Sequence, residues 1–440
     1  MELNVMRLRT PLLPIGSAGS ASAAIAVASL LSVLSPVANA DPVESQWPAD
    51  VIASPVFSEN FTGTQLDGTG LDETKWNYRT DQYKSGMQSA QKAANVSVSS
   101  GALNIALKTE STVVQTSNGP ITQLYSGGGI VSKQTFRYGY YEVQVKVNPT
   151  SGWHSSFWLQ AGDGTTTYPS YRRTEIDGFE IDSKSQTWYR HNIFEWYPPF
   201  TNPPELTDNP QIVTFLASGA KLSDDFHTYG VDWEESGVSY YFDGNLVYLD
   251  PKDSPPTKTS FAYPPSADTH DKLSIWLTDV ATESPTVGAA PDQIQFKNVR
   301  YWQKDFYVSN ADAGSGYAEV AGTWLDSSLH GWTKDEPTRY ATCGVPGSVA
   351  TWTPNILNAG AYDAYYYNVV NANSDPNTRL DVAGQTTMVN GTTGTSGWVK
   401  LNATPLNLPA GTATAVTLTS SESGCARTDA VKFVRNTSGS

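Results

Sequence analysis

The nine residues that decide how this sequence folds and functions read Thr174-Glu175-Ile176-Asp177-Gly178-Phe179-Glu180-Ile181-Asp182. Polar and apolar residues alternate along most of this stretch, which is typical of a β-strand. On a regular strand Glu175 and Asp177 share one face, and Glu180 has the opposite parity. A β-bulge at Gly178-Phe179 would add one residue and return Glu180 to the face of Glu175. We therefore predict a bulged strand that carries three carboxylates on one face.

Three neighbouring carboxylates are unfavourable for stability, because like charges repel and raise one another's pKa. They suit a retaining glycosidase, in which two carboxyl groups about 5–5.5 Å apart share the reaction: one attacks the anomeric carbon and the other protonates the leaving oxygen. Asp177 would lie between Glu175 and Glu180, hydrogen-bond the nucleophile and help to partition protons. The spacing alone fits equally well an exposed acidic edge strand that resists aggregation, so both interpretations stay open at this point.

The rest of the chain favours an all-β protein with two domains. A high content of Gly, Tyr and Trp with few Lys, Arg and Met suits many short strands joined by turns. About 400 residues beyond the N-terminal leader exceed one typical domain, and the composition changes near residues 304–309. Asp243-Gly244-Asn245 between two aromatic-rich runs predicts a hairpin. Alternating patterns predict strands in four further segments, Val96–Ala106, Tyr138–Val147, Val238–Tyr248 and Gln295–Tyr301.

The charge and the aromatic content point to a neutral or weakly charged ligand. A formal net charge of −15 argues against nucleic acid, which is bound by clustered Lys and Arg. It also makes highly sulfated glycans less favourable, although one local basic cleft would be enough to bind them. The 13 Trp residues offer flat rings on which pyranose C–H faces stack, although most of them are expected to fill cores. A polysaccharide is therefore the expected partner.

The N-terminus has the features of a secretory signal peptide over residues 1–40. Arg7 and Arg9 precede an apolar run at about 23–34, and Ala38-Asn39-Ala40 provides a small-x-small cleavage signal. The apolar run is too short for a comfortable membrane span, and nothing later in the chain rivals it. We therefore expect a secreted, extracellular protein without a membrane anchor, and we expect it to be a monomer.

Residues 51–303 resemble glycoside hydrolase family 16, whose bulged signature is Glu-x-Asp-x-x-Glu. Several segments beside the carboxylate strand carry the resemblance in order and spacing: Phe57–Phe61, Leu71–Asn77, Ser132-Lys133, Tyr138–Val143, Gly152-Trp153, Phe157–Leu159, Phe226–Trp233 and Tyr240–Gly244. The resemblance implies a concanavalin-like β-jelly-roll sandwich for a catalytic domain at 41–304. It also implies that Glu175 is the nucleophile, Asp177 its assistant and Glu180 the general acid/base of an endo-acting β-glycosidase.

The resemblance leaves the substrate open between a β-galactan of the agar type and a β-1,3-glucan. Family members that cleave β-1,3-glucan usually carry Gly before the first catalytic Glu, where this chain has Thr174. Two further functions also stay open on the same fold, a non-catalytic glycan-binding protein and a glycan transglycosylase. The candidate substrate-binding residues are Trp153, Trp158, Arg173, His191, Glu195 and Trp196, and for each of them a purely structural role is about as plausible.

Residues 305–440 resemble the golvesin-type, xanthan-lyase-like module of secreted polysaccharide enzymes, which implies a smaller β-sandwich. The matching segments are Asn310-Ala311-Asp312, Ala350–Pro354, Gly397–Val399 and Asp429–Phe433. Trp324, Trp332 and Trp352 are candidates for a glycan-binding face, with at least one expected in the core. Cys343 and Cys425, the two cysteines of an exported chain, predict a disulfide.

No cofactor is expected, because a two-carboxylate hydrolysis needs none. No Cys/His cluster suggests a metal site. Some members of the family bind a structural calcium, and Glu59 is the residue that could hold one here.

Overall fold

The computed structural model describes residues 55–63, 70–80, 89–116, 119–164, 173–196, 206–207, 212–217, 219–251, 272–282, 292–311, 314, 316–332 and 337–436. The expected signal peptide at 1–40 lies outside the described residues. Within the described part, no helix is long and apolar enough to cross a membrane. Almost all regular structure in it is β-strand, with one short 3₁₀ turn at Ala93–Asn95. The expectation of an all-β chain is confirmed.

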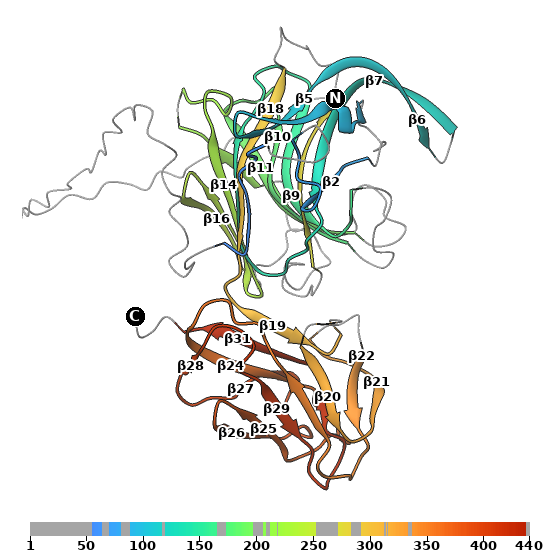
Figure 1. Ribbon diagram of the computed structural model, residues 1–440, viewed down its shortest axis with the longest axis vertical. Helices are drawn as coiled ribbons and strands as arrows, with labels where there is room; N and C mark the ends of the chain where they lie inside the picture. The colour runs from blue at the N-terminus through green and yellow to red at the C-terminus, as the bar shows by residue number, and fades with distance from the viewer. Residues whose placement is uncertain are drawn as a thin grey trace, which may run out of the picture. The chain divides into compact units, whose positions relative to one another are not determined.

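The N-terminal domain contains two large sheets that are antiparallel except for the parallel pair β3 and β7 (Figure 1). The eight-stranded sheet has the order β16 (Asn245–Pro251), β15 (Gly237–Phe242), β14 (His227–Glu234), β8 (Gly139–Lys146), β18 (Gln293–Trp302), β5 (Ala102–Ala106) and β4 (Val96–Ser99), with β1 (Phe57–Glu59) paired to β18. The ten-stranded sheet has the order β12 (Leu206–Thr207), β11 (Trp188–Trp196), β10 (Arg173–Asp182), β9 (Trp153–Gln160), β17 (Ser274–Ala281), β7 (Gly119–Ser132) and β2 (Trp76–Tyr78). In addition, β13 (Ile212–Phe215) pairs with β11, and β3 (Ser89–Gln91) and β6 (Lys108–Thr116) pair with β7.

The two sheets pack face to face around one apolar core. Val145 and Val231 of the eight-stranded sheet belong to the same buried cluster as Phe157, Ile176 and Phe179 of the ten-stranded sheet. Each of these strands alternates core residues with residues on its outer face, as expected for a sandwich. Some neighbouring strands are distant in sequence, such as β9 and β17, and these pairs give the crossed connections of a jelly roll.

The strands predicted from sequence are present, and two of the predicted segments are each divided into two strands. The segment 96–106 forms two strands, β4 and β5, because Ser100 and Gly101 have φ of 53° and 68° and turn the chain back. The predicted hairpin joins β15 to β16 through Asp243 and Gly244, with φ of 46° and 76°. Two successive residues with positive φ are the signature of the tight turns that match the twist of a hairpin.

The C-terminal domain is a smaller assembly of three sheets with its own core. The first has the order β19 (Phe306–Ser309), β31 (Ala430–Arg435), β24 (Gly360–Asn368) and β27 (Gly397–Lys400), with β28 (Leu406–Leu408) paired to β24. The second has the order β20 (Tyr317–Ala321), β23 (Val349–Trp352), β29 (Val416–Thr419), β25 (Thr378–Val382) and β26 (Gln385–Val389). The third joins β21 (Trp324–His330), β22 (Pro337–Ala341) and β30 (Arg427–Thr428). The predicted disulfide is formed between Cys343 and Cys425.

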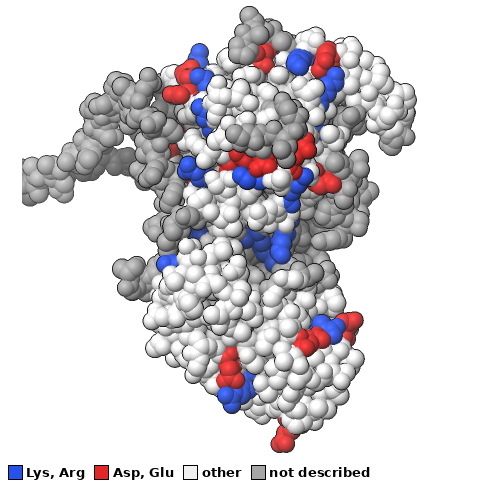
Figure 2. All heavy atoms as spheres, in the orientation of Figure 1, with Lys and Arg blue, Asp and Glu red and all other residues white. Residues whose placement is uncertain are grey.

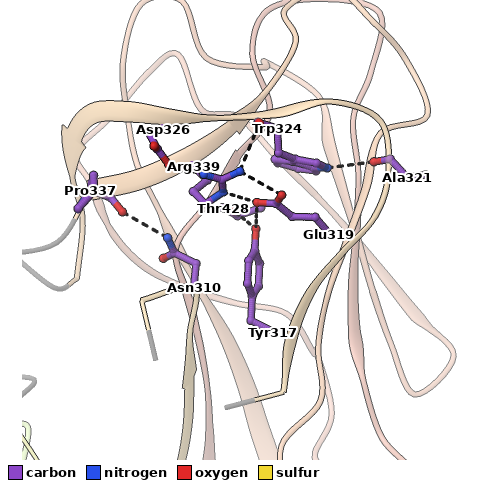
Figure 3. Close-up of polar contacts among 9 residues, drawn as sticks. All are labelled: Asn310, Tyr317, Glu319, Ala321, Trp324, Asp326, Pro337, Arg339 and Thr428. Carbon is purple, nitrogen blue, oxygen red and sulfur yellow. Dashed lines mark hydrogen bonds and ion pairs between the residues drawn. The ribbon is translucent and has the colours of Figure 1, made fainter. Parts of the chain in front are cut away.

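The three tryptophans proposed for a glycan-binding face of this domain are all buried, so that prediction is wrong. Trp352 is fully buried in the domain core, and Trp324 belongs to the same cluster. The indole of Trp324 donates to the carbonyl of Ala321 at 2.9 Å (Figure 3). Trp332 is 7% exposed and stacks on Tyr307 with ring centroids 5.1 Å apart. Burial of Trp324 and Trp352 supplies apolar area that the core of a domain of this size needs.

The charged groups of the C-terminal domain tie strands together. Most of its surface in Figure 2 is uncharged, with charged side chains in a few small groups. In the group drawn in Figure 3, the guanidinium of Arg339 on β22 donates to Glu319 on β20 and to Asp326 on β21. The hydroxyl of Tyr317 also donates to Glu319, at 3.1 Å. One arginine thus links strands of two sheets through charge-assisted hydrogen bonds.

Candidate active site

The predicted bulge in the carboxylate strand is confirmed by the register on both sides of β10. On the β9 side Asp177 lies opposite Trp158, and Phe179 lies opposite Phe157, so Gly178 is the extra residue. On the β11 side the register shifts between Asp177 and Glu180 in the same way. Glu180 therefore has the parity of Glu175 and Asp177, and all three carboxylates belong to the outer face of the ten-stranded sheet. We call this surface the carboxylate face; it includes His154, Ser156, Trp158 and Gln160 of β9 and Arg190 and Trp196 of β11.

Glycine is required at the bulge because there is no room for a side chain. A Cβ at position 178 would lie 2.5 Å from Cδ1 of Phe157 and 2.9 Å from Cγ2 of Val231. Both neighbours are fully buried in the core between the sheets. The bulge therefore presses backbone against a core ring, and the strand can carry its extra residue here because position 178 has no Cβ.

Two donors orient the carboxylate of Glu175. Gln160 donates from Nε2 to Oε2 of Glu175, and Trp196 donates from its indole Nε1 to the same oxygen at 3.1 Å. Gln160 lies directly opposite Glu175 on β9, and Trp196 lies on β11, so the donors reach the carboxylate from both sides. Both act on the same oxygen, Oε2, so these two contacts restrict the orientation of the carboxylate.

Glu180 is held by a chain of charged groups that crosses three strands. His154 on β9 places Nε2 3.2 Å from Oε1 of Glu180 and Nδ1 3.1 Å from Oδ1 of Asp182. Arg190 on β11 donates to Oδ2 of Asp182 at 2.7 Å. Asp182 follows Glu180 by two residues and therefore shares its face. The imidazole ring of His154 thus lies between the carboxylates of Glu180 and Asp182, and Asp182 is also paired with Arg190.

The pKa values of this chain reflect the pairing. Burial acts to lower the pKa of His154, but its hydrogen bonds to Asp182 and Glu180 outweigh burial and raise it to about 9. Burial acts to raise the pKa of Glu180, but the hydrogen bond and charge of His154, with the charge of Arg190, lower it. The hydrogen bond from His154 lowers the pKa of Asp182 to about 2. An imidazolium between two carboxylates is therefore the favoured charge state at neutral pH.

Two of the predicted substrate-binding tryptophans lie on the carboxylate face. Trp196 contacts Glu175 as described. Trp158 lies opposite Asp177 but is only 4% exposed, because it packs against Trp276 with ring centroids 4.6 Å apart and has the guanidinium carbon of Arg79 5.4 Å from its ring centre. The predicted residues Arg173 and Glu195 lie on β10 and β11, but their side chains are outside the part of the chain that the structure describes.

Two other predicted substrate-binding residues, Trp153 and His191, are core residues, so that assignment is wrong for them. Trp153 is fully buried in a small cluster with Leu107 and Ala281. His191 is fully buried and stacks on Tyr240, with ring centroids 4.2 Å apart, and burial lowers its pKa to about 3. The reason is parity: Arg190 lies on the carboxylate face, so its neighbour His191 points into the sandwich.

Sequence reasoning missed His154 and Gln160, together with an aromatic pair beside the chain of charges. Trp188 on β11 has the guanidinium of Arg190 5.8 Å from its ring centre and lies directly opposite Phe215 on β13. Phe215 is 73% exposed. The signal available in the sequence was the alternation along β9, which places His154, Ser156, Trp158 and Gln160 on one face once the strand is paired with β10.

Glu59, the residue considered for a structural calcium, has its oxygens engaged by protein donors. Its Oε1 accepts from the backbone N–H of Phe61 at 2.7 Å, and its Oε2 accepts from Lys75 Nζ at 3.1 Å. A lysine ammonium beside this carboxylate does not suit a bound calcium ion. Among the described residues, no group of three or more His, Cys, Asp and Glu side chains is placed to hold a metal ion.

Two family models match this chain and meet between its two domains. The model of the GH16 domain of beta-porphyranases A–D matches residues 54–304, which is more than half of the chain. The model of the golvesin C-terminal domain matches residues 306–435.

Comparison with individual proteins gives polysaccharide hydrolases. Kappa-carrageenase of Pseudoalteromonas carrageenovora is 31% identical over 197 residues, which cover 40% of this chain and 47% of that protein. Beta-porphyranase B of Zobellia galactanivorans is 25% identical over 195 residues, covering 41% of this chain and 64% of that protein. The chain thus spans less than half the length of the first of these relatives. Among solved structures, porphyranase B from Zobellia galactanivorans is 22% identical with a TM-score of 0.41, covering 56% of this chain and 90% of that chain.

Proposed function

The chain belongs to the family of GH16 domains of beta-porphyranases A–D, and we propose from this that it is an endo-acting β-glycosidase that hydrolyses a β-linked polysaccharide with retention of configuration. The observation that carries the proposal is the bulge at Gly178, which places Glu175, Asp177 and Glu180 on one face of β10. A double displacement requires two carboxyl groups on one face, one as the nucleophile and one as the general acid/base.

In the first step the ionised carboxylate of Glu175 attacks the anomeric carbon through Oε1. The C1–O bond to the leaving sugar breaks, and Glu180 gives its proton to that oxygen. Gln160 and Trp196, which bind Oε2 of Glu175, hold the nucleophile in one orientation during the attack. The product is a glycosyl ester on Glu175 and a shortened chain with a new hydroxyl group.

In the second step Glu180, now a carboxylate, takes a proton from a water molecule as the water oxygen attacks C1. The ester bond to Glu175 breaks, and the β configuration returns. Asp177 is 2% exposed and lies between the two glutamates on the same face, where its charge favours keeping a proton nearby. The cycle consumes one water per bond and needs no cofactor.

The substrate we propose is a β-linked galactan of the agar or porphyran class. The family model is that of beta-porphyranases, and a kappa-carrageenase is among the relatives at 31% identity. Thr174 precedes the first catalytic glutamate, where β-1,3-glucanases of the family usually have Gly. Arg190 and the exposed ring of Phe215, which lies on the same side of the sheet, give the carboxylate face a cation and an aromatic surface, a combination that suits polar sugar rings.

We expect Gln160→Leu to lower kcat about 10- to 100-fold, because the nucleophile loses a donor that orients it. KM is expected to change little, since Gln160 acts on Glu175 rather than on the sugar. Steady-state kinetics on the hydrolysed polymer measures both constants. Gln115→Leu, on an exposed position of β6, is the matched control. An unchanged kcat in Gln160→Leu would contradict the proposal that Gln160 orients Glu175.

We expect Phe215→Ala to raise KM about 5- to 10-fold with kcat nearly unchanged. Phe215 is exposed beside Trp188 on the side of the sheet that carries Arg190, where a sugar ring away from the scissile bond can stack. Loss of one stacking contact of about 1 kcal/mol corresponds to a change of this size. Met388→Ala, an exposed apolar residue of the C-terminal domain, is the control. Equal KM values for Phe215→Ala and the unaltered enzyme would exclude this subsite.

We also propose that the protein is secreted, that it acts outside the cell as a monomer, and that its partner is the polysaccharide. Residues 1–40 carry the features of a signal peptide. N-terminal sequencing of protein recovered from the culture medium tests the cleavage after Ala40, and light scattering tests the monomer. Full-length protein retained in the cells would contradict secretion.

Release of reducing ends from a panel of polymers tests the proposed function. Porphyran, agarose, κ-carrageenan, laminarin and mixed-linkage glucan are incubated with the enzyme and with Glu175→Gln. Activity on a galactan that is lost in the variant is the expected result. Activity on a β-glucan alone would correct the substrate, and binding without hydrolysis would favour a glycan-binding protein. Products longer than the starting oligosaccharides would favour a transglycosylase.

A further inference from the structure

We propose that His154 stores the proton that Glu180 delivers, so that the two side chains work as one proton-sharing pair that Asp182 and Arg190 hold in position. This inference rests on the proposed glycosidase function. It assigns a positioning and proton-storing role to a residue that does not touch the sugar.

The geometry restricts where the protons can be. A ring nitrogen can hydrogen-bond an ionised carboxylate only as an N–H donor, and a neutral imidazole has one N–H. Asp182 is held ionised by Arg190, 2.7 Å away, so Nδ1 of His154 donates to it across 3.1 Å. The contact of 3.2 Å between Nε2 and Glu180 then needs one more proton, on either Nε2 or the carboxyl group. The pair therefore holds a proton in either arrangement.

Three further titratable or charged groups act on the pair from neighbouring segments. Asp279 on β17 is fully buried, and burial raises its pKa well above the ordinary value, while the charge of His154 acts to lower it. Lys184, in the turn after β10, acts electrostatically on Asp182 and lowers its pKa, as does Arg190 on β11. The two carboxyl groups in contact with the ring thus both come from β10, Asp279 lies on the opposite face of the sheet beside Ser155, and the cations lie beyond Asp182.

Sharing a proton resolves a conflict in the site. A general acid must be protonated, yet the pKa of Glu180 is lowered by the hydrogen bond and charge of its neighbour. The proton on Nε2 moves to the carboxylate of Glu180 and from there to the leaving oxygen, so that after the first step His154 is neutral and Glu180 is again a carboxylate. In the second step water gives a proton back to the pair, so that atoms and charges return to their starting state.

The expected consequence is a change in the alkaline limb of the pH profile of kcat/KM. In the unaltered enzyme the pair loses its proton as the pH rises through about 9, the pKa of His154. In His154→Gln the proton must reside on Glu180 alone, and the general-acid carboxyl group of a glycosidase without such a histidine has a pKa of about 6. We therefore expect the alkaline limb to move to lower pH by at least about two units, with KM within about threefold at the optimum.

His227→Gln is the matched control for this substitution. Its Nδ1 lies 2.8 Å from Oδ2 of Asp243, so it is also a histidine paired with an aspartate, but it belongs to β14 of the other sheet. We expect its pH profile to coincide with that of the unaltered enzyme. An alkaline limb that stays in place in His154→Gln, while the unaltered enzyme hydrolyses the polymer, would overturn the proton-sharing role and leave the proposed function intact.

A second measurement does not depend on activity. Nuclear magnetic resonance of the imidazole nitrogens gives the pKa of His154 in the whole protein and in Glu180→Gln. Proton sharing predicts a high pKa that falls by about one unit or more when the Glu180 charge is removed. The same pKa in both proteins would overturn the proposal even if His154→Gln fails to fold. Absence of hydrolysis on every polymer, with the NMR shift present, would count against the proposed function alone.

Discussion

Glu175→Gln is expected to lower kcat by at least about 10⁴-fold, with a KM close to that of the unaltered enzyme. An amide has no charge with which to attack the anomeric carbon, and it cannot form the glycosyl ester that divides the reaction into two steps. Gln is nearly isosteric with Glu, so it keeps the bulged strand and the core beneath it. The measurement is kcat on the hydrolysed polymer, with a thermal melt to show that the variant is folded.

Glu175→Ala adds a second result that only a nucleophile explains. A small anion such as azide can enter the space left by the carboxylate and attack C1 from the same side, which yields an α-glycosyl azide. The matched change Glu180→Ala would be expected to give the β-azide instead, because the ester on Glu175 still forms and azide replaces water. Full activity in Glu175→Gln, or the same azide anomer in both alanine variants, would contradict the assigned roles.

Gly178→Ala is expected to destabilise the fold by about 1–3 kcal/mol and, in the protein that still folds, to lower kcat about 100-fold. The new Cβ would lie 2.5 Å from a ring carbon of Phe157, which is fully buried in the core between the sheets. Either the ring or the bulge must shift, and a shift of the bulge changes the position of Glu180. Chemical denaturation gives the free energy of unfolding, and kinetics gives kcat.

Gly397→Ala is the control for the bulge substitution. It also adds a Cβ to a strand glycine, on β27 of the C-terminal domain, but no atom lies within 4 Å of the new group. We expect its stability and activity to match those of the unaltered protein. If Gly178→Ala were as stable and as active as Gly397→Ala, the tight packing under the bulge would not be what positions the carboxylates.

The sequence was sufficient to predict the bulge, because the parity of Glu175 and Glu180 demands an extra residue and Gly178 is where one fits. It did not reveal which face of the neighbouring strand meets the carboxylates. His191 and Trp196 have opposite parity on one regular strand, so they could not both lie beside Glu175. Only the pairing of β10 with β11 shows that Trp196 lies beside Glu175 and that His191 points into the core.

His154 was overlooked for a related reason. It lies next to Trp153 in an aromatic-rich segment. Its partners Glu180 and Asp182 are more than 20 residues away along the chain, so no local pattern links them to it. The antiparallel pairing of β9 with β10 brings the ring opposite Asp182. For the C-terminal domain the sequence predicts that some of Trp324, Trp332 and Trp352 form a surface, but a small domain needs large rings such as Trp324 and Trp352 inside to bury enough apolar area.

The anomeric form of the first product tests the two-glutamate mechanism most directly. Proton NMR spectra are recorded in the first minutes of hydrolysis of the polymer identified in the panel, before the new reducing end mutarotates. Double displacement by Glu175 and Glu180 predicts that the β-anomer appears first and the α-anomer follows at the rate of mutarotation. Initial appearance of the α-anomer would mean direct attack by water, and Glu175 would then not be a nucleophile.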